Sequence, residues 1–221
     1  MKKILVVFVV VAIALLGATA AMAGISATKH NLSTTGPGAT TATAETEICI
    51  FCHTPHGGNP AVAPLWNKPA NTGTLTAYGT TKAGTLVGAP TTGVSFACMA
   101  CHDGVSAMGA VLNTSAAGIA ADTIALSNAT MPAAGSLGLP MNNDHPVAFA
   151  YTVAVAGMKL LNATGAGNVV RPVGPGVGTL PLGLSGAMME CSSCHEPHST
   201  NTSFLRLPNT NSDLCLSCHL K

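Results

Sequence analysis

All eight cysteines of this 221-residue chain lie in a single five-residue pattern, which occurs four times. Each copy reads C-x-x-C-H, so that a histidine follows the second cysteine in every case. We number the copies motifs 1 to 4 in chain order: Cys49-Ile-Phe-Cys52-His53, Cys98-Met-Ala-Cys101-His102, Cys191-Ser-Ser-Cys194-His195 and Cys215-Leu-Ser-Cys218-His219. This pattern is the attachment signature of c-type haem. The two thiols form thioethers with one haem, and the histidine supplies a proximal nitrogen to its iron, so we expect four haem c groups.

Other uses of the cysteines explain less of the pattern. An exported chain could pair eight cysteines in four disulfides. A C-x-x-C pair could also be a redox dithiol or half of a zinc site. None of these alternatives requires a histidine directly after the second cysteine four times, whereas haem attachment does.

The remaining histidines match the expected haems in number. Four of the eight histidines lie outside the motifs: His30, His56, His145 and His198. Four irons need four further ligands if every haem is six-coordinate, so we expect these to be the distal ligands. Methionine ligation stays open as an alternative, with candidates at Met108, Met131, Met141, Met158, Met188 and Met189.

Two of these histidines follow a motif closely. His56 stands three residues after His53 in "CHTPH", and His198 stands three residues after His195 in "CHEPH". A residue so near the proximal ligand stays on the proximal side of that haem. It can reach the iron of a neighbouring haem, because the intervening proline turns the chain. We therefore expect the haems at motifs 1 and 3 each to lie against another haem.

The rest of the chain indicates a fold with little regular structure. Gly and Pro clusters such as Gly36-Pro37-Gly38 interrupt nearly every segment, and only 4% of the residues are aromatic. We expect mainly coil with a few short helices at the motifs and little or no sheet, apart from a possible strand at Val147–Val155. Haem would then form the core. The alternation of long "CHTPH"-type and short motifs suggests a repeated two-haem module.

The N-terminus has the features of a secretory signal peptide. Lys2 and Lys3 precede an apolar run, and Ala21-Met22-Ala23 forms an A-x-A cleavage site. We expect residues 1–23 to be removed and residues 24–221 to form one tetrahaem domain without a membrane span. An uncleaved anchor helix is the alternative, although the apolar run is short for a membrane span. The expected mature chain has seven basic and eight acidic side chains, and no basic patch indicates a nucleic-acid partner.

Several phrases around the motifs resemble a known group of proteins. "EICIFCHTPHGG", "KHNLSTTGPG", "NDHPVAF" and the closing "LCLSCH" are similar to secreted multihaem c-type cytochromes of the c3-like class. Within that class they resemble the extracellular nanowire cytochromes of the OmcE type. The resemblance implies four bis-histidine haems and head-to-tail filaments in which one distal histidine crosses between subunits. Compared with small periplasmic c3 proteins, this chain is longer and poorer in lysine.

These features together predict electron transfer, not catalysis. A six-coordinate haem has no open position for a substrate, so we expect no enzyme activity. The expected form is a secreted subunit of an extracellular or cell-surface filament, with other copies of itself and redox proteins or extracellular acceptors as partners. The alternatives are a monomeric periplasmic carrier and a multihaem enzyme, which would need one haem with a vacant position. His30 lies on a short terminal arm and is the candidate for the ligand donated to a neighbouring copy.

Overall fold

The computed structural model describes residues 24–62, 64–81, 86–114, 123–151, 169–170, 180–181 and 188–219. The expected signal peptide lies outside these ranges. The described helices are α2 (Gly93–His102), α3 (Cys191–Cys194), α4 (Asp213–Leu216) and the 3₁₀ turns η1 (Cys49–Phe51), η2 (Thr202–Phe204) and η3 (Thr210–Ser212). No helix in these ranges is long and apolar enough to cross a membrane.

The described strands are only two residues long and form three antiparallel pairs. The pairs are β1 (Gly79–Thr80) with β2 (Leu86–Val87), β3 (Phe149–Ala150) with β6 (Met188–Met189), and β4 (Val169–Val170) with β5 (Leu180–Pro181). Of the possible strand at Val147–Val155, only Phe149–Ala150 forms a strand among the described residues, and its residues after Tyr151 lie outside the described ranges. Most of the described chain has no regular structure.

Each motif lies in a helix or helical turn. Polar side chains determine where α2 and α3 begin. The carboxylate of Glu190 accepts a hydrogen bond from the backbone N–H of Ser95 in the first turn of α2, at 3.0 Å. Glu190 is also the N-cap of α3, where its side chain and that of Ser193 form a reciprocal capping box. Such contacts satisfy backbone N–H groups that a helix leaves free at its start. One buried glutamate therefore orders the starts of the helices that carry motifs 2 and 3.

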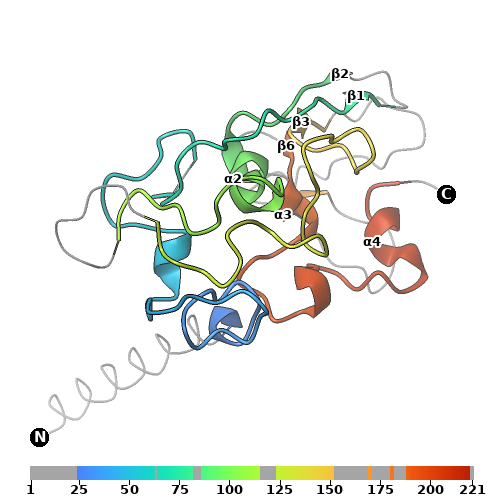
Figure 1. Ribbon diagram of the computed structural model, residues 1–221. Helices are drawn as coiled ribbons and strands as arrows, with labels where there is room; N and C mark the ends of the chain where they lie inside the picture. Colours follow the sequence, from blue (N-terminus) through green and yellow to red (C-terminus); the bar gives the residue numbers. More distant parts are fainter. Residues whose placement is uncertain are drawn as a thin grey trace, which may run out of the picture.

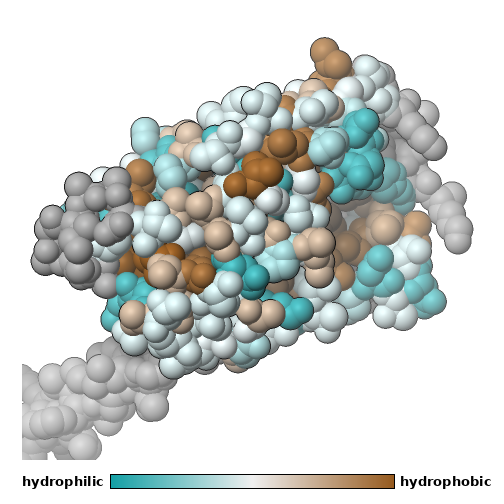
Figure 2. Space-filling model, viewed as in Figure 1, coloured by the Kyte–Doolittle hydropathy of each residue, from teal (hydrophilic) through white to brown (hydrophobic). Residues whose placement is uncertain are grey.

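Buried apolar residues are spread through the described chain, and two small clusters stand out among them. One contains Tyr151, Leu180, Met189 and Cys218, and the other contains Ala42, Phe51, Val111 and Ile124. Figure 2 shows the hydrophobic residues on the visible face as small separate groups rather than one broad patch. Each cluster includes side chains from a motif or its neighbours, so the described core is thin and built around the motifs. A core filled by haem stays a prediction.

The helices that carry the motifs are distributed across the molecule. Figure 1 shows α2 and α3 next to each other at the centre, with α4 to one side near the C-terminus and η1 to the other. Contacts between α2 and α3 join segments almost a hundred residues apart in sequence. Motifs 2 and 3 are therefore central, and motifs 1 and 4 flank them.

Candidate functional site

Each C-x-x-C-H motif forms one helical turn. The backbone N–H of the motif histidine donates to the carbonyl of the first cysteine at 2.8 Å in motif 1, 3.0 Å in motif 3 and 3.0 Å in motif 4. Motif 2 forms the last turn of α2. Residues at i, i+3 and i+4 share one face of a helix. Every motif therefore directs two thiols and one imidazole to the same side, which is the donor set that one haem c requires.

The thiols of the motifs lie near one another. All eight cysteines are free of disulfides. A hydrogen bond joins the side chains of Cys98 in motif 2 and Cys191 in motif 3, and it lowers the pKa of Cys191 to about 7. Burial raises the pKa of Cys52 to about 12, and the charge of Cys101 adds to the rise. The attachment points of motif 2 thus lie beside those of motifs 1 and 3.

The motif histidines are oriented by the backbone. In three of them Nδ1 is within hydrogen-bonding distance of a carbonyl oxygen: His53 with Pro64 at 3.2 Å, His102 with Gly135 at 2.7 Å and His195 with Ser203 at 2.9 Å. A carbonyl can only accept, so Nδ1 carries the proton and Nε2 is left bare. This is the tautomer of a histidine that binds metal through Nε2.

Three motif histidines face a histidine from outside the motifs. The ring centroids are 6.3 Å apart for His53 and His198, 6.2 Å for His102 and His30, and 6.3 Å for His219 and His145. An imidazole nitrogen binds a metal at about 2 Å, and the ring centroid lies about 1 Å farther, so two rings on opposite sides of one iron are about 6 Å apart. The three pairs have the separation that an iron between them requires.

His30 is held within its own chain. Its ring stacks on Phe204 with centroids 4.2 Å apart, and its Nδ1 lies 3.2 Å from the carbonyl oxygen of Pro197. Burial lowers the pKa of His30, which favours the neutral imidazole that binds metal. The geometry makes His30 a partner of His102 in the same chain. Its donation to another copy stays a prediction, because the structure contains one chain.

His198 and His145 are also oriented through Nδ1. Nδ1 of His198 lies 3.2 Å from Oε1 of Glu196, whose other oxygen forms a 2.8 Å ion pair with Arg206. Nδ1 of His145 lies 2.9 Å from the carbonyl oxygen of Pro146. His198 follows motif 3 but faces the histidine of motif 1, so this part of the structure is consistent with the predicted contact between neighbouring sites.

The fourth pair is not formed. Within the described ranges, neither His56 nor His195 has another histidine ring in contact. The structure therefore brings three of the four expected distal histidines opposite a motif histidine and leaves His56 apart. Among the candidate methionines, Met108, Met141 and Met189 are buried, and Met158 lies outside the described residues.

Several residues that support the motifs were not identified from the sequence. Asn67 is fully buried, and its Nδ2 donates to the carbonyls of Ile50 at 2.6 Å and Asn113 at 2.8 Å. It fixes the turn of motif 1 against a distant segment. Glu190 does the same for motifs 2 and 3. The order Glu-x-x-Ser is the reverse of the usual capping box, in which Ser or Thr precedes Glu or Gln by three residues, so neither Glu190 nor a single asparagine gave a sequence signal.

Comparison with known proteins gives one finding. A family model described as "Doubled CXXCH motif" matches residues 186–221, which contain motifs 3 and 4. No curated protein matches the chain. The matched motif indicates covalently bound haem c and suggests a multihaem c-type cytochrome, which is consistent with electron transfer.

Proposed function

We propose that the protein carries electrons through four covalently attached haems c, each with its iron between two histidines. The observation that supports this most strongly is the set of three opposed histidine pairs at 6.2–6.3 Å. Every pair joins a motif histidine to a histidine outside the motifs. Nothing in the chemistry of disulfides, dithiols or zinc sites requires that pairing.

The geometry supports a specific assignment of distal ligands. His198 serves haem 1, His30 serves haem 2 and His145 serves haem 4. His56 is left for haem 3, whose proximal ligand is His195. Haems 1 and 3 would then exchange ligands reciprocally, since each long motif would provide the distal histidine of the other haem.

The chain's own residues perform three tasks in this function. The cysteines would fix each haem, carbonyl acceptors at Nδ1 hold three motif imidazoles with Nε2 bare, and a second histidine would bind each iron. Haem iron supplies the chemistry, which is the gain and loss of one electron. If each iron is held between two histidines, no position is open to a substrate, so the proposed function is a carrier and not an enzyme.

The test is to produce the protein in cells that attach haem c and to measure its haem content and spin state. We expect four haems per chain and a wholly low-spin spectrum. His145→Ala should convert one haem, haem 4, to high spin and leave three low-spin. A native protein with fewer than four haems, or with high-spin iron at rest, would overturn the assignment.

We further propose that the protein is exported and acts as the subunit of an extracellular filament, with a monomeric periplasmic carrier as the alternative. The sequence resemblance supports this proposal. The contact between His30 and His102 is also compatible with it, because an exchange of N-terminal segments would make the same contact between two copies. Electron microscopy of native material should show filaments, and light scattering should show large assemblies.

The assembly has a separate genetic test. His30→Ala should abolish filaments and make haem 2 high-spin if exchange occurs. In a monomeric carrier the variant would change the spectrum alone, with the same mass by light scattering as the parent. His56→Ala is the matched comparison, because it removes the distal histidine proposed for haem 3 instead.

A further inference from the structure

Phe204 contacts the ring of His30, the distal ligand proposed for haem 2. The two rings are stacked, with centroids 4.2 Å apart and planes 10° apart. The planes of His30 and His102 are 76° apart, so Phe204 also lies crosswise to the motif histidine. The single bond between an iron and an imidazole nitrogen lets the ring turn, and contacts beyond the ligand fix its orientation. Phe204 covers one face of the His30 ring and therefore opposes that rotation.

The backbone at Phe204 has a conformation that bulky residues rarely adopt. Ser203 has φ of 53° and Phe204 has φ of 58°, both in the left-handed region. Such residues persist only where the surrounding contacts hold them. Here the carbonyl of Phe204 accepts the backbone N–H of Glu196 at 2.7 Å, and its own N–H donates to the carbonyl of Asn201 at 2.8 Å. The turn is thus held by hydrogen bonds on both sides of Phe204.

The same loop holds two of the proposed iron ligands. The carbonyl oxygen of Ser203 lies 2.9 Å from Nδ1 of His195, the motif histidine of haem 3. The carbonyl oxygen of Pro197 lies 3.2 Å from Nδ1 of His30. The loop after motif 3 therefore contacts His30 at one edge through Pro197 and at one face through Phe204.

Apolar packing alone does not account for this position of Phe204. The side chain is half-buried. It belongs to neither of the two apolar clusters of the described residues, nor to the partly buried side chains that pack against them. The ring contact recorded for it is the one with His30. A strained turn that presents an aromatic face to a histidine indicates a role in orienting that histidine.

We propose that Phe204 is a positioning residue that holds His30 crosswise to His102 at haem 2. This inference rests on the proposed function. Each axial imidazole donates electron density to the iron d orbital perpendicular to its plane. Crossed rings therefore leave two d orbitals nearly equal in energy, whereas parallel rings separate them. The EPR spectrum of the ferric form reports the difference, because crossed rings give one strongly low-field line and parallel rings give three resolved lines.

The experiment is EPR of the fully oxidised holoprotein and of Phe204→Leu, which keeps apolar bulk but has no flat face. In the parent, haems 2 and 4 should give crossed-ring signals, since the planes of His145 and His219 are 75° apart. The haem 2 signal is the one that His30→Ala removes. Phe204→Leu should move that signal to higher field, toward the parallel-ring form, and leave the haem 4 signal in place. An unchanged haem 2 signal in Phe204→Leu would overturn the proposal.

A conservative variant separates ring orientation from general disruption. Phe204→Tyr keeps the flat ring and should keep the parent signal. If haem 2 becomes high-spin in Phe204→Leu but stays low-spin in Phe204→Tyr, the aromatic face is needed to place the ligand, which supports the proposal. The same change in both variants contradicts it.

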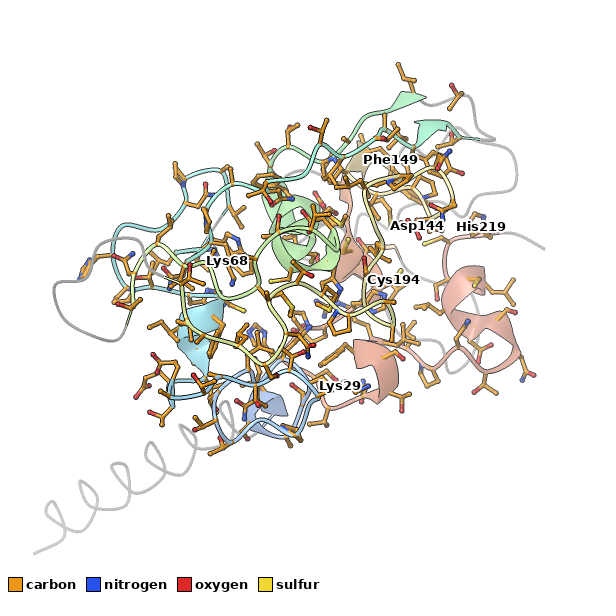
Figure 3. The ribbon with its side chains drawn as sticks, in the orientation of Figure 1. Lys29, Lys68, Asp144, Phe149, Cys194 and His219 are labelled. Carbon is orange, nitrogen blue, oxygen red and sulfur yellow. The ribbon has the colours of Figure 1, made fainter. Side chains whose placement is uncertain are left out.

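Phe149→Leu is the matched control. Phe149 is also half-buried, but it packs against the apolar cluster that contains Tyr151. Figure 3 shows it far from Lys29, the residue before His30. The haem 2 signal should not change in this variant, and a shift as large as that in Phe204→Leu would refute a specific role for Phe204. Failure of the proposed function is recognised separately, since the parent protein would then lack four low-spin haems.

Discussion

At the scale of single residues, the number of histidines predicted how many ligand pairs to expect but not which residues form them. Four motif histidines and four others predicted four ligand pairs, and three pairs face each other in the structure. The sequence could indicate that His198 reaches another haem, because it follows His195 too closely to reach the same one. It could not indicate that His53 is its partner, since that depends on how distant coil segments pack.

At this scale, the burial of Lys68 and Asn67 could not be predicted from the sequence. Both are buried beside motif 1, but a single lysine or asparagine in a coil segment has no period or spacing that predicts burial. The cysteines and histidines were recognisable because their pattern repeats. A side chain that acts through one carbonyl contact is visible only when the segments around it are placed.

Glu196 provides a residue-scale prediction about haem 1. A carboxylate that accepts from Nδ1 makes an imidazole a stronger ligand and stabilises ferric iron. Glu196→Gln should therefore raise the potential of haem 1, as measured by redox titration of the holoprotein, and leave haem 4 unchanged. A fall in the potential of haem 1 would contradict this role.

Protonation of Glu196 at low pH should raise the potential of haem 1, as the Glu196→Gln substitution should. Burial raises the pKa of Glu196, but hydrogen bonds from His198 and the charge of Arg206 outweigh it and hold the pKa below its ordinary value. A lowered folded pKa means that the carboxylate contributes stability above its unfolded pKa, about 4.3, which is lost as pH falls through the folded value. The potential of haem 1 should rise only in that acidic range. A midpoint near pH 7 for this change would exclude Glu196 as its source.

At the scale of elements, the short helices follow from the motifs and their caps. The sequence predicted helical turns at C-x-x-C-H, and the structure has a helical turn at each. It could not predict that α2 and α3 share a cap, because Glu190 and Ser95 are far apart in the chain. The two-residue strands have too little length for an alternating pattern, so neither their pairing nor their register could be predicted.

Glu190→Ala should destabilise the contact between α2 and α3. It leaves the backbone N–H of Ser95 without its buried acceptor, and an unsatisfied buried group costs about 1–3 kcal/mol. Chemical unfolding followed by circular dichroism should show a loss of that size, and amide exchange should accelerate at the start of α2. Glu47→Ala is the control, because Glu47 is exposed. Equal stability of the two variants would show that the shared cap contributes nothing.

At the scale of the whole molecule, the buried apolar side chains of the described residues lie in small groups. Two clusters have four buried residues each, and others such as Met99 and Met108 are buried outside them. Burying a large apolar side chain contributes about 1.5–3 kcal/mol, whereas ordering each backbone residue costs about 1–2 kcal/mol. In the proposed holoprotein, four haems would add apolar surface against which the long coil segments pack.

This argument predicts that the protein does not fold without haem. Protein produced in cells that lack haem attachment should give a random-coil circular dichroism spectrum, rapid amide exchange and no cooperative unfolding transition. The control is the same sequence produced with haem attachment, which should unfold cooperatively. A cooperative transition in the haem-free chain would show that its own side chains suffice.

The position of His198 opposite His53 joins the two ends of the chain at one site. Under the proposed assignment, the first haem is bound at the beginning of the chain and receives its second histidine from a residue near the end. A product truncated before motif 3 would therefore have a first site with one histidine instead of two, and a foreign ligand could bind there.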